Sequence, residues 1–133
     1  MEDLGHHYVL DVVLDDEIFL KSEHRLQVFF QDILSKTNFK VIGFLSHKFT
    51  VGGEGVTGIF LLSESHLSYH TYPESNYISI DLYTCGEKCL SALREIEAGL
   101  SSVTRIVVRY IERGSHINTP QFNKVSVTAE KVN

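Results

Sequence analysis

The chain has 133 residues, of which 43% are apolar and 22% are charged, and its formal net charge is −5. This length supports one domain core, and this composition excludes a disordered, collagen-like or low-complexity protein. The negative charge argues against a nucleic-acid-binding protein, and no run of about 18 apolar residues predicts a membrane span. The acidic start Met1-Glu2-Asp3 is unlike a signal peptide, and two cysteines do not make a disulfide framework. We therefore expect a cytoplasmic protein.

The first half of the chain predicts one strand, one helix and two further strands. β-Branched and aromatic residues predict a strand from His6 to Leu14. Ser22 is a candidate helix N-cap, and a helix follows it. Apolar residues then recur at helical spacing, at Leu26, Phe29, Phe30, Ile33 and Leu34. Strands are predicted from Phe39 to Phe49 and from Val56 to Leu62, separated by a glycine-rich turn at 51–55.

The second half predicts an extended segment, a strand, a helix and a last strand. These are Ser63–His70, which continues extended from the preceding strand, then Tyr77–Tyr83, Glu87–Leu100 and Val103–Ile111. Polar and apolar residues alternate from Tyr77 to Tyr83, which is typical of a half-buried strand. Cys89 lies on the apolar face of the predicted helix and is expected in the core.

The resulting order, β-α-β-β-β-α-β, predicts an α+β fold. We expect a two-layer sandwich, a mainly antiparallel sheet with both amphipathic helices on one face. The other face is then exposed or buried in a dimer. Residues 1–114 are predicted to form the domain and residues 115–133 a polar tail, in which a weak edge strand is one option and a mobile segment the other.

Unusual chemistry is concentrated between Ser63 and Glu74 and again near Cys85. The first stretch, SESHLSYHTYPE, places serines, histidines and carboxylates among apolar strands. Cys85 is expected at a strand-to-helix junction, where backbone N–H groups favour the thiolate form. His66 and His70 have HxxxH spacing, but their segment reads as extended and has no evident third ligand, so no metal site is predicted.

The run SESHLSYHTYPE followed by DLYTCGE resembles the prokaryotic S-adenosylmethionine decarboxylase proenzyme family. That family's pattern is close to ESH-x-x-x-HTWPE, followed by a strand that ends in TCG. Leu4-Gly5-His6-His7 resembles the family's LGRH start, and Glu112-Arg113-Gly114 resembles its closing ERG. The resemblance spans residues 4 to 114 and implies the fold of this family.

The resemblance implies a pyruvoyl-dependent enzyme that cuts itself between Glu64 and Ser65, leaving a β chain of residues 1–64 and an α chain from residue 65. The Ser65 hydroxyl would attack the Glu64 carbonyl, and elimination from the resulting ester would yield the pyruvoyl group. His70 matches the histidine that assists elimination as acid or base. Thr57 stands where the family usually has the serine that stabilises the processing intermediate, and its methyl group predicts slower processing.

For turnover, the resemblance implies a Schiff base between the substrate and the pyruvoyl ketone, which accepts electrons as CO₂ departs. Cys85 matches the proton donor to the substrate α-carbon. Phe49 matches an aromatic residue that packs on adenine, Glu74 matches a carboxylate of the substrate site, and Tyr72 replaces the family's tryptophan. The family implies a homodimer of processed protomers, with active sites near the interface, that supplies the aminopropyl donor for spermidine synthesis.

Two departures from the family pattern keep alternatives open. Tyr72 and the loop between Phe49 and Thr57, which is longer than usual, both lie where substrate is held. One alternative is therefore the same chemistry on arginine or ornithine. A second is a non-processing binding or regulatory domain, although a binding role would not require Ser65 and Cys85 together.

Overall fold

The computed structural model describes residues 3–63, 65–86, 88–118 and 126–132. The α-helices and strands are β1 (Gly5–Leu14), α1 (Glu17–Lys21), α2 (Glu23–Lys36), β2 (Val41–Lys48), β3 (Val56–Leu62), β4 (Ser65–Tyr72), β5 (Tyr77–Thr84), α3 (Lys88–Gly99), β6 (Val103–Arg113) and β7 (Ser126–Val132). Short 3₁₀ turns occupy Pro73–Ser75 and Ser115–Asn118. The strands form one antiparallel sheet in the order β2-β3-β4-β5-β1-β6-β7.

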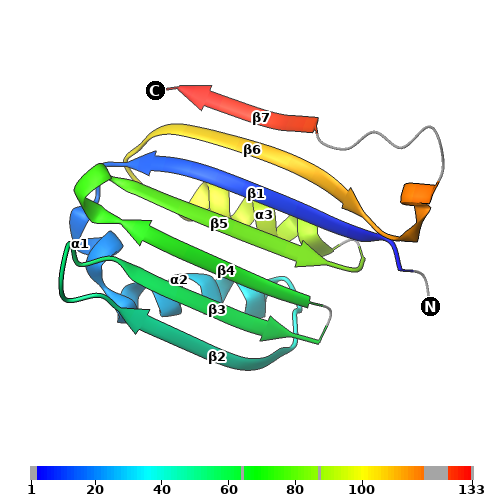
Figure 1. Cartoon of the computed structure of the whole chain (residues 1–133), viewed down its shortest axis with the longest axis horizontal. Helices are drawn as coiled ribbons and strands as arrows, with labels where there is room; N and C mark the ends of the chain where they lie inside the picture. Colours follow the sequence, from blue (N-terminus) through cyan, green and yellow to red (C-terminus); the bar gives the residue numbers. More distant parts are fainter. Residues whose placement is uncertain (1–2, 64, 87, 119–125, 133) are drawn as a thin grey trace.

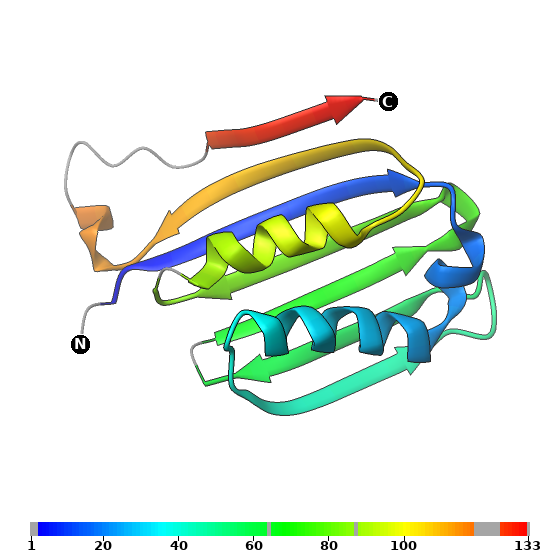
Figure 2. The same cartoon turned by 180° about the vertical axis from the view of Figure 1, so that it is seen from behind.

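The helices cover one face of this sheet and leave the other face open (Figures 1 and 2). This confirms the predicted α+β sandwich. The predicted alternation in β5 is also confirmed, because Ile78, Ile80 and Leu82 are buried under the helices. Their neighbours Asp81 and Tyr83 therefore lie on the open face.

The strand β1 lies inside the sheet between β5 and β6, although it comes first in the chain (Figure 1). His6 is opposite Thr84 on one side and Glu112 on the other. The N-terminal strand is therefore held by two strands from the second half of the chain.

A short helix that the sequence analysis did not predict, α1, precedes the predicted helix α2. Asp16 caps α1 by accepting a hydrogen bond from the Phe19 N–H at 3.2 Å. Ser22 then has extended backbone angles, which end α1, and its hydroxyl accepts from the Arg25 N–H at 3.1 Å. Ser22 is therefore the N-cap that the sequence predicts, and the same residue ends the short helix before it.

The extended segment after β3 is a separate strand, which corrects the predicted element order. Leu62 is opposite Ser65, and β4 runs back antiparallel along β3. Neither Gly nor Pro lies between Leu62 and Ser65 in the sequence, and strand reversals are hard to recognise without them. A further strand, β7, lies within the predicted polar tail and pairs with β6.

The core lies between the helices and the covered face of the sheet. Phe30 of α2 stacks on Tyr69 of β4, with ring centroids 4.6 Å apart and an interplanar angle of 16°. Both side chains are fully buried. Cys89 is also buried, as the sequence predicts, and packs among the apolar residues of this core.

Candidate active site

Ser65 and Cys85 lie at one end of the central strands. Ser65 is the first residue of β4 and is opposite Thr84, the last residue of β5. Cys85 directly follows Thr84, is exposed and forms no disulfide. The two residues thus come from adjacent strand ends, although 20 positions separate them in the sequence. Residue 64, the other half of the predicted cleavage site, lies outside the described residues.

Thr57 and His70 form a second group toward the other end of the same strands. They are opposite each other on β3 and β4, and Thr57 Oγ1 lies 3.0 Å from His70 Nδ1, which is a hydrogen-bonding distance. Because both side chains lie on the open face, this pair is half-buried rather than enclosed in the core.

A cavity of about 360 Å³ adjoins the Thr57–His70 pair. The sequence-predicted residues that line it are Phe49, Thr57, His70, Tyr72 and Glu74. Aromatic side chains and one carboxylate thus meet beside an imidazole, which suits a ligand with a planar ring and polar groups.

The glycine-rich loop 51–55 forms one wall of this cavity. A Cβ atom on Gly53 would come within 2.9 Å of Glu74 Oε2, so the loop backbone presses close to that carboxylate. Glu54 in the same loop forms an ion pair with Lys21 of α1 at 3.0 Å, which ties the loop to the first helix. The segment that departs from the family pattern therefore shapes the wall of the cavity.

The two groups are separated within one chain. Ser65 and His70 are five positions apart on β4, which corresponds to about 16 Å in a strand. They also lie on opposite faces, because side chains alternate along the strand. One copy of the chain therefore does not bring the Ser65 hydroxyl within reach of the His70 ring.

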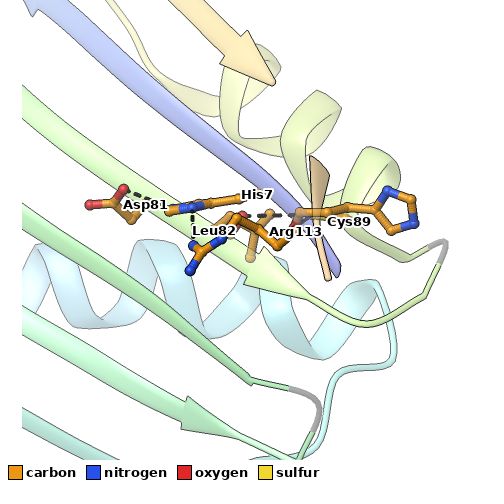
Figure 3. Close-up of polar contacts among 6 residues, drawn as sticks. His7, Asp81, Leu82, Cys89 and Arg113 are labelled. Carbon is orange, nitrogen blue, oxygen red and sulfur yellow. Dashed lines mark hydrogen bonds and ion pairs between the residues drawn. The ribbon is translucent and has the colours of Figure 1, made fainter. Parts of the chain in front are cut away.

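A charged network to which the sequence analysis assigns no role lies on the open face beside His66, and its members come from three of the quoted motifs. His7 Nε2 lies 3.1 Å from Asp81 Oδ1, and Arg113 donates to His7 Nδ1 at 3.2 Å. Dashed lines in Figure 3 join His7 to both residues. With Nδ1 accepting, the His7 proton is on Nε2 and is donated to Asp81. The predicted alternation of β5 already places Asp81 on the face away from the helices, and the structure confirms it.

His66 adjoins the same network. Its pKa is lowered, first by burial and then by the neighbouring His7, while the Asp81 carboxylate acts in the opposite direction. The nearby Tyr83 ring, 5.8 Å away between centroids, contributes to this burial. His66 therefore favours its neutral form in the folded protein.

The two cysteines differ in their surroundings. Burial raises the pKa of Cys89 to about 11, so its thiol stays protonated. Its Sγ lies 3.8 Å from the Leu82 carbonyl oxygen (Figure 3), consistent with a weak hydrogen bond from the thiol. The exposed Cys85 is the cysteine available to a ligand.

Two findings concern only the described part of the chain. No group of three or more His, Cys, Asp and Glu side chains there is arranged to hold a metal ion. None of the helices within it has the length and apolar character that crossing a bilayer requires.

A family model described as S-adenosylmethionine decarboxylase matches residues 6–114. The chain belongs to the S-adenosylmethionine decarboxylase family. Among its relatives is the S-adenosylmethionine decarboxylase proenzyme of Pyrococcus abyssi, 34% identical over 88 residues, which are 66% of this chain and 62% of that protein. The proenzyme of Clostridium tetani is also 34% identical over 88 residues, covering 66% of this chain and 68% of that protein.

The fold of this family member is also found in a solved structure. The adenosylmethionine decarboxylase from Aquifex aeolicus superposes with a TM-score of 0.77 at 28% identity, covering 93% of this chain and 100% of that one. The match to the Pyrococcus abyssi relative spans 62% of that protein's length.

Proposed function

We propose that this protein is a self-cleaving, pyruvoyl-dependent decarboxylase that acts on S-adenosylmethionine. The observation that carries the proposal is the cavity shared by Phe49, Thr57, His70, Tyr72 and Glu74. The sequence motifs assign processing or substrate binding to each of these residues, and they come from separate segments of the chain. The family match supports the same reaction.

The position of Ser65 fits the pyruvoyl group that the family implies. Ser65 is half-buried as the first residue of β4, opposite Leu62 of β3, and the exposed Cys85 follows Thr84, its cross-strand neighbour on β5. A serine buried in mid-strand would be less suited to self-cleavage, because the chain could not part there without breaking the ladder. When formed, the group supplies an electron sink for the electrons released as CO₂ leaves.

Self-cleavage begins with the Ser65 hydroxyl. Its oxygen bonds to the Glu64 carbonyl carbon, the C–N bond to Ser65 breaks, and the hydroxyl proton moves to the freed nitrogen. In the proposal, Thr57 holds the His70 ring through the 3.0 Å contact, and His70 acts as acid or base in the elimination that follows. During turnover, Cys85 gives a proton to the substrate α-carbon.

Substrate binding is assigned to the cavity. Phe49 offers a ring face for adenine and for a cationic sulfonium, and Glu74 offers a carboxylate for polar groups. Tyr72 stacks on Tyr77, with centroids 5.6 Å apart, which holds one wall of the cavity. Arginine and ornithine lack the purine ring that this aromatic lining suits.

We infer that a second copy of the chain completes each active site. Ser65 and Cys85 lie at one strand end, whereas Thr57 and His70 lie about 16 Å away by strand length. Two copies whose open faces meet about a two-fold axis can bring the strand end that carries Ser65 alongside the His70 of the other copy, which then reaches Ser65 past the end of β4. The open face carries exposed apolar residues that such contact would bury, namely Val13, Leu45, Ile59 and Leu61.

Cleavage at the proposed position leaves an interlocked protomer. The β chain would contain β1 to β3, and the α chain would contain β4 to β7. Because β1 lies between β5 and β6, and β3 pairs with β4, three ladders join the two fragments without a covalent bond. The fragments are therefore expected to elute together under native conditions and to separate in denaturant.

The first test is a denatured intact-mass spectrum of the purified protein. We expect two fragments divided between residues 64 and 65, the second lighter by one ammonia than its sequence predicts. Release of CO₂ from carboxyl-labelled S-adenosylmethionine, arginine and ornithine then identifies the substrate. A single uncut mass together with no CO₂ release would overturn the proposed function, and release from arginine or ornithine alone would replace the substrate.

Variants separate processing from turnover. Ser65→Ala is expected to stay intact and inactive, whereas Ser91→Ala, a control on the exposed side of α3, is expected to cleave normally. Cys85→Ala is expected to cleave normally but to lose about 10²- to 10⁴-fold in kcat, the range of a positioned proton donor. Full decarboxylation by Cys85→Ala would remove its assigned role.

The composite site has its own test. Neither Ser65→Ala nor His70→Ala is expected to cleave alone. When both are made in one cell, mixed dimers contain one site with an intact Ser65 and an intact His70, so the His70→Ala chain is cleaved. If co-expression leaves the His70→Ala chain whole, the shared site is wrong, while cleavage of the wild-type chain still stands.

A further inference from the structure

Thr84 carries a buried hydroxyl beside the proposed cleavage site. Its side chain is 1% exposed, and among the described residues Thr84 Oγ1 meets no hydrogen-bond partner other than the neighbouring Cys89 thiol, whose pKa this contact lowers against the effect of burial. Buried hydroxyls are usually paired, because an unpaired one loses its bond to water and gains nothing in return. The position therefore calls for a physical reason.

Other buried threonines of this protein are paired. Thr37 donates to the Ile33 carbonyl at 2.7 Å, and Thr71 donates to the Leu20 carbonyl at 2.7 Å. Thr71 also accepts from the Val56 N–H at 2.8 Å. Thr84 stands apart from both, although all three are shielded from solvent.

The group opposite Thr84 on β4 is Ser65. Directly opposite residues of an antiparallel pair share a face, and their Cβ atoms lie about 4.5–5.5 Å apart. Rotation about χ1 of either side chain therefore brings the two hydroxyls toward each other. The Cys89 thiol, which contacts Thr84, also has the carbonyl oxygens of His6 and Leu82 as acceptors at 3.6 and 3.8 Å.

We propose that Thr84 is a positioning residue for self-cleavage, and that its hydroxyl accepts a hydrogen bond from Ser65 Oγ and aims that oxygen at the Glu64 carbonyl carbon. This inference rests on the proposed function. Thr84 takes no proton in the step: the Ser65 proton moves to the freed amide nitrogen, as described above. A buried acceptor whose only other described partner is a weakly hydrogen-bonding thiol suits this role, because that thiol competes little with Ser65 for the Thr84 oxygen.

The proposal predicts opposite effects on cleavage and on stability. Thr84→Val keeps the shape of the side chain and removes the hydroxyl. Cleavage is expected to slow about tenfold, the rate equivalent of one lost hydrogen bond. Stability is expected to stay equal or to rise, because valine removes a buried hydroxyl whose only described partner is a weakly hydrogen-bonding thiol. Thr84→Ser keeps the hydroxyl and is expected to cleave within about threefold of the wild-type rate.

The experiment measures cleavage of freshly synthesised chains by gel and mass spectrometry. Stability is measured by urea unfolding in a Ser65→Ala background, in which every chain stays intact. Thr37→Val is the matched control, because it removes a paired hydroxyl far from Ser65. It is expected to cleave at the wild-type rate and to lose stability, which is the reverse of Thr84→Val.

Three outcomes overturn the inference while leaving the proposed function in place. One is wild-type cleavage by Thr84→Val. Another is Thr84→Ser cleaving as slowly as Thr84→Val. The third is a loss of stability in Thr84→Val that equals the loss in Thr37→Val, which would make the hydroxyl structural. Failure of the wild-type chain itself to cleave would instead refute the proposed function.

Discussion

The Thr57 hydroxyl and the His70 ring lie 3.0 Å apart across the β3–β4 ladder, on the open face of the sheet. The contact joins two residues that come from different motifs of the sequence. It also orients the imidazole beside the cavity that Glu74 and Phe49 line. A hydroxyl at position 57 therefore controls which way the proposed acid/base group faces.

Thr57 can be tested by changing its hydroxyl and its methyl group separately. Thr57→Val is expected to slow self-cleavage about 10- to 100-fold, because His70 loses its hydrogen-bond partner. Thr57→Ser is expected to cleave as fast as wild type or faster, because the hydroxyl is kept and its rotamer is freer. A gel time course of newly made chains measures both. Thr104→Val, which removes an exposed hydroxyl from β6, should leave the rate unchanged.

We expect a substitution in the glycine-rich loop 51–55 to weaken the binding of substrate. Gly53→Ala would place a Cβ within 2.9 Å of Glu74 Oε2, displacing that carboxylate, and is expected to raise KM about fivefold with little change in kcat. Gly52→Ala is the matched control, because Gly52 also has a positive φ but no neighbour within 4 Å of an added Cβ. Equal KM values for the two variants would show that loop strain, rather than contact with Glu74, sets the effect.

Because of His66, we expect the protein to lose free energy of unfolding in weak acid. Its pKa is lowered in the folded protein, chiefly by burial and then by His7, whereas the unfolded chain keeps the ordinary value of about 6.5. Below that value the unfolded chain binds more protons, so stability falls as the pH drops from 7 through 6.5. Urea unfolding in the Ser65→Ala background should show a smaller fall for His66→Gln. His24→Gln, on the exposed side of α2, should retain the wild-type slope.

The packing of α2 on β4 predicts a large effect of core truncation. Phe30→Ala removes a fully buried ring that stacks on Tyr69 and is expected to cost about 3–5 kcal/mol of unfolding free energy. Val28→Ala, on the exposed side of the same helix, is expected to change it by less than about 0.5 kcal/mol. Chemical denaturation of the Ser65→Ala chain measures both. A small effect of Phe30→Ala would mean that the helix is not anchored through this stack.

Local patterns in the sequence determined the elements with clear periodicity. The i, i+3, i+4 spacing after Ser22 predicted α2, and the alternation from Tyr77 to Tyr83 predicted β5 and its buried face. The reversal between β3 and β4 was missed, because residues 63–64 lack the glycine or proline that usually marks a tight turn. The periodicity of apolar residues predicts which face of a helix or strand is buried. It does not predict where the chain reverses within an apolar segment.

The sequence also predicted the chemistry that we propose for the candidate site, because the motifs around Ser65, His70 and Cys85 depend on residue types and spacing alone. Only the tertiary structure decided which of these residues meet. Long-range strand pairing brings Cys85 to Ser65, whereas the extended geometry of β4 carries His70 about 16 Å away from Ser65. The tertiary structure also buries the Thr84 hydroxyl beside Ser65. Burial depends on which strands and helices cover a residue, and not on the residues next to it in the sequence.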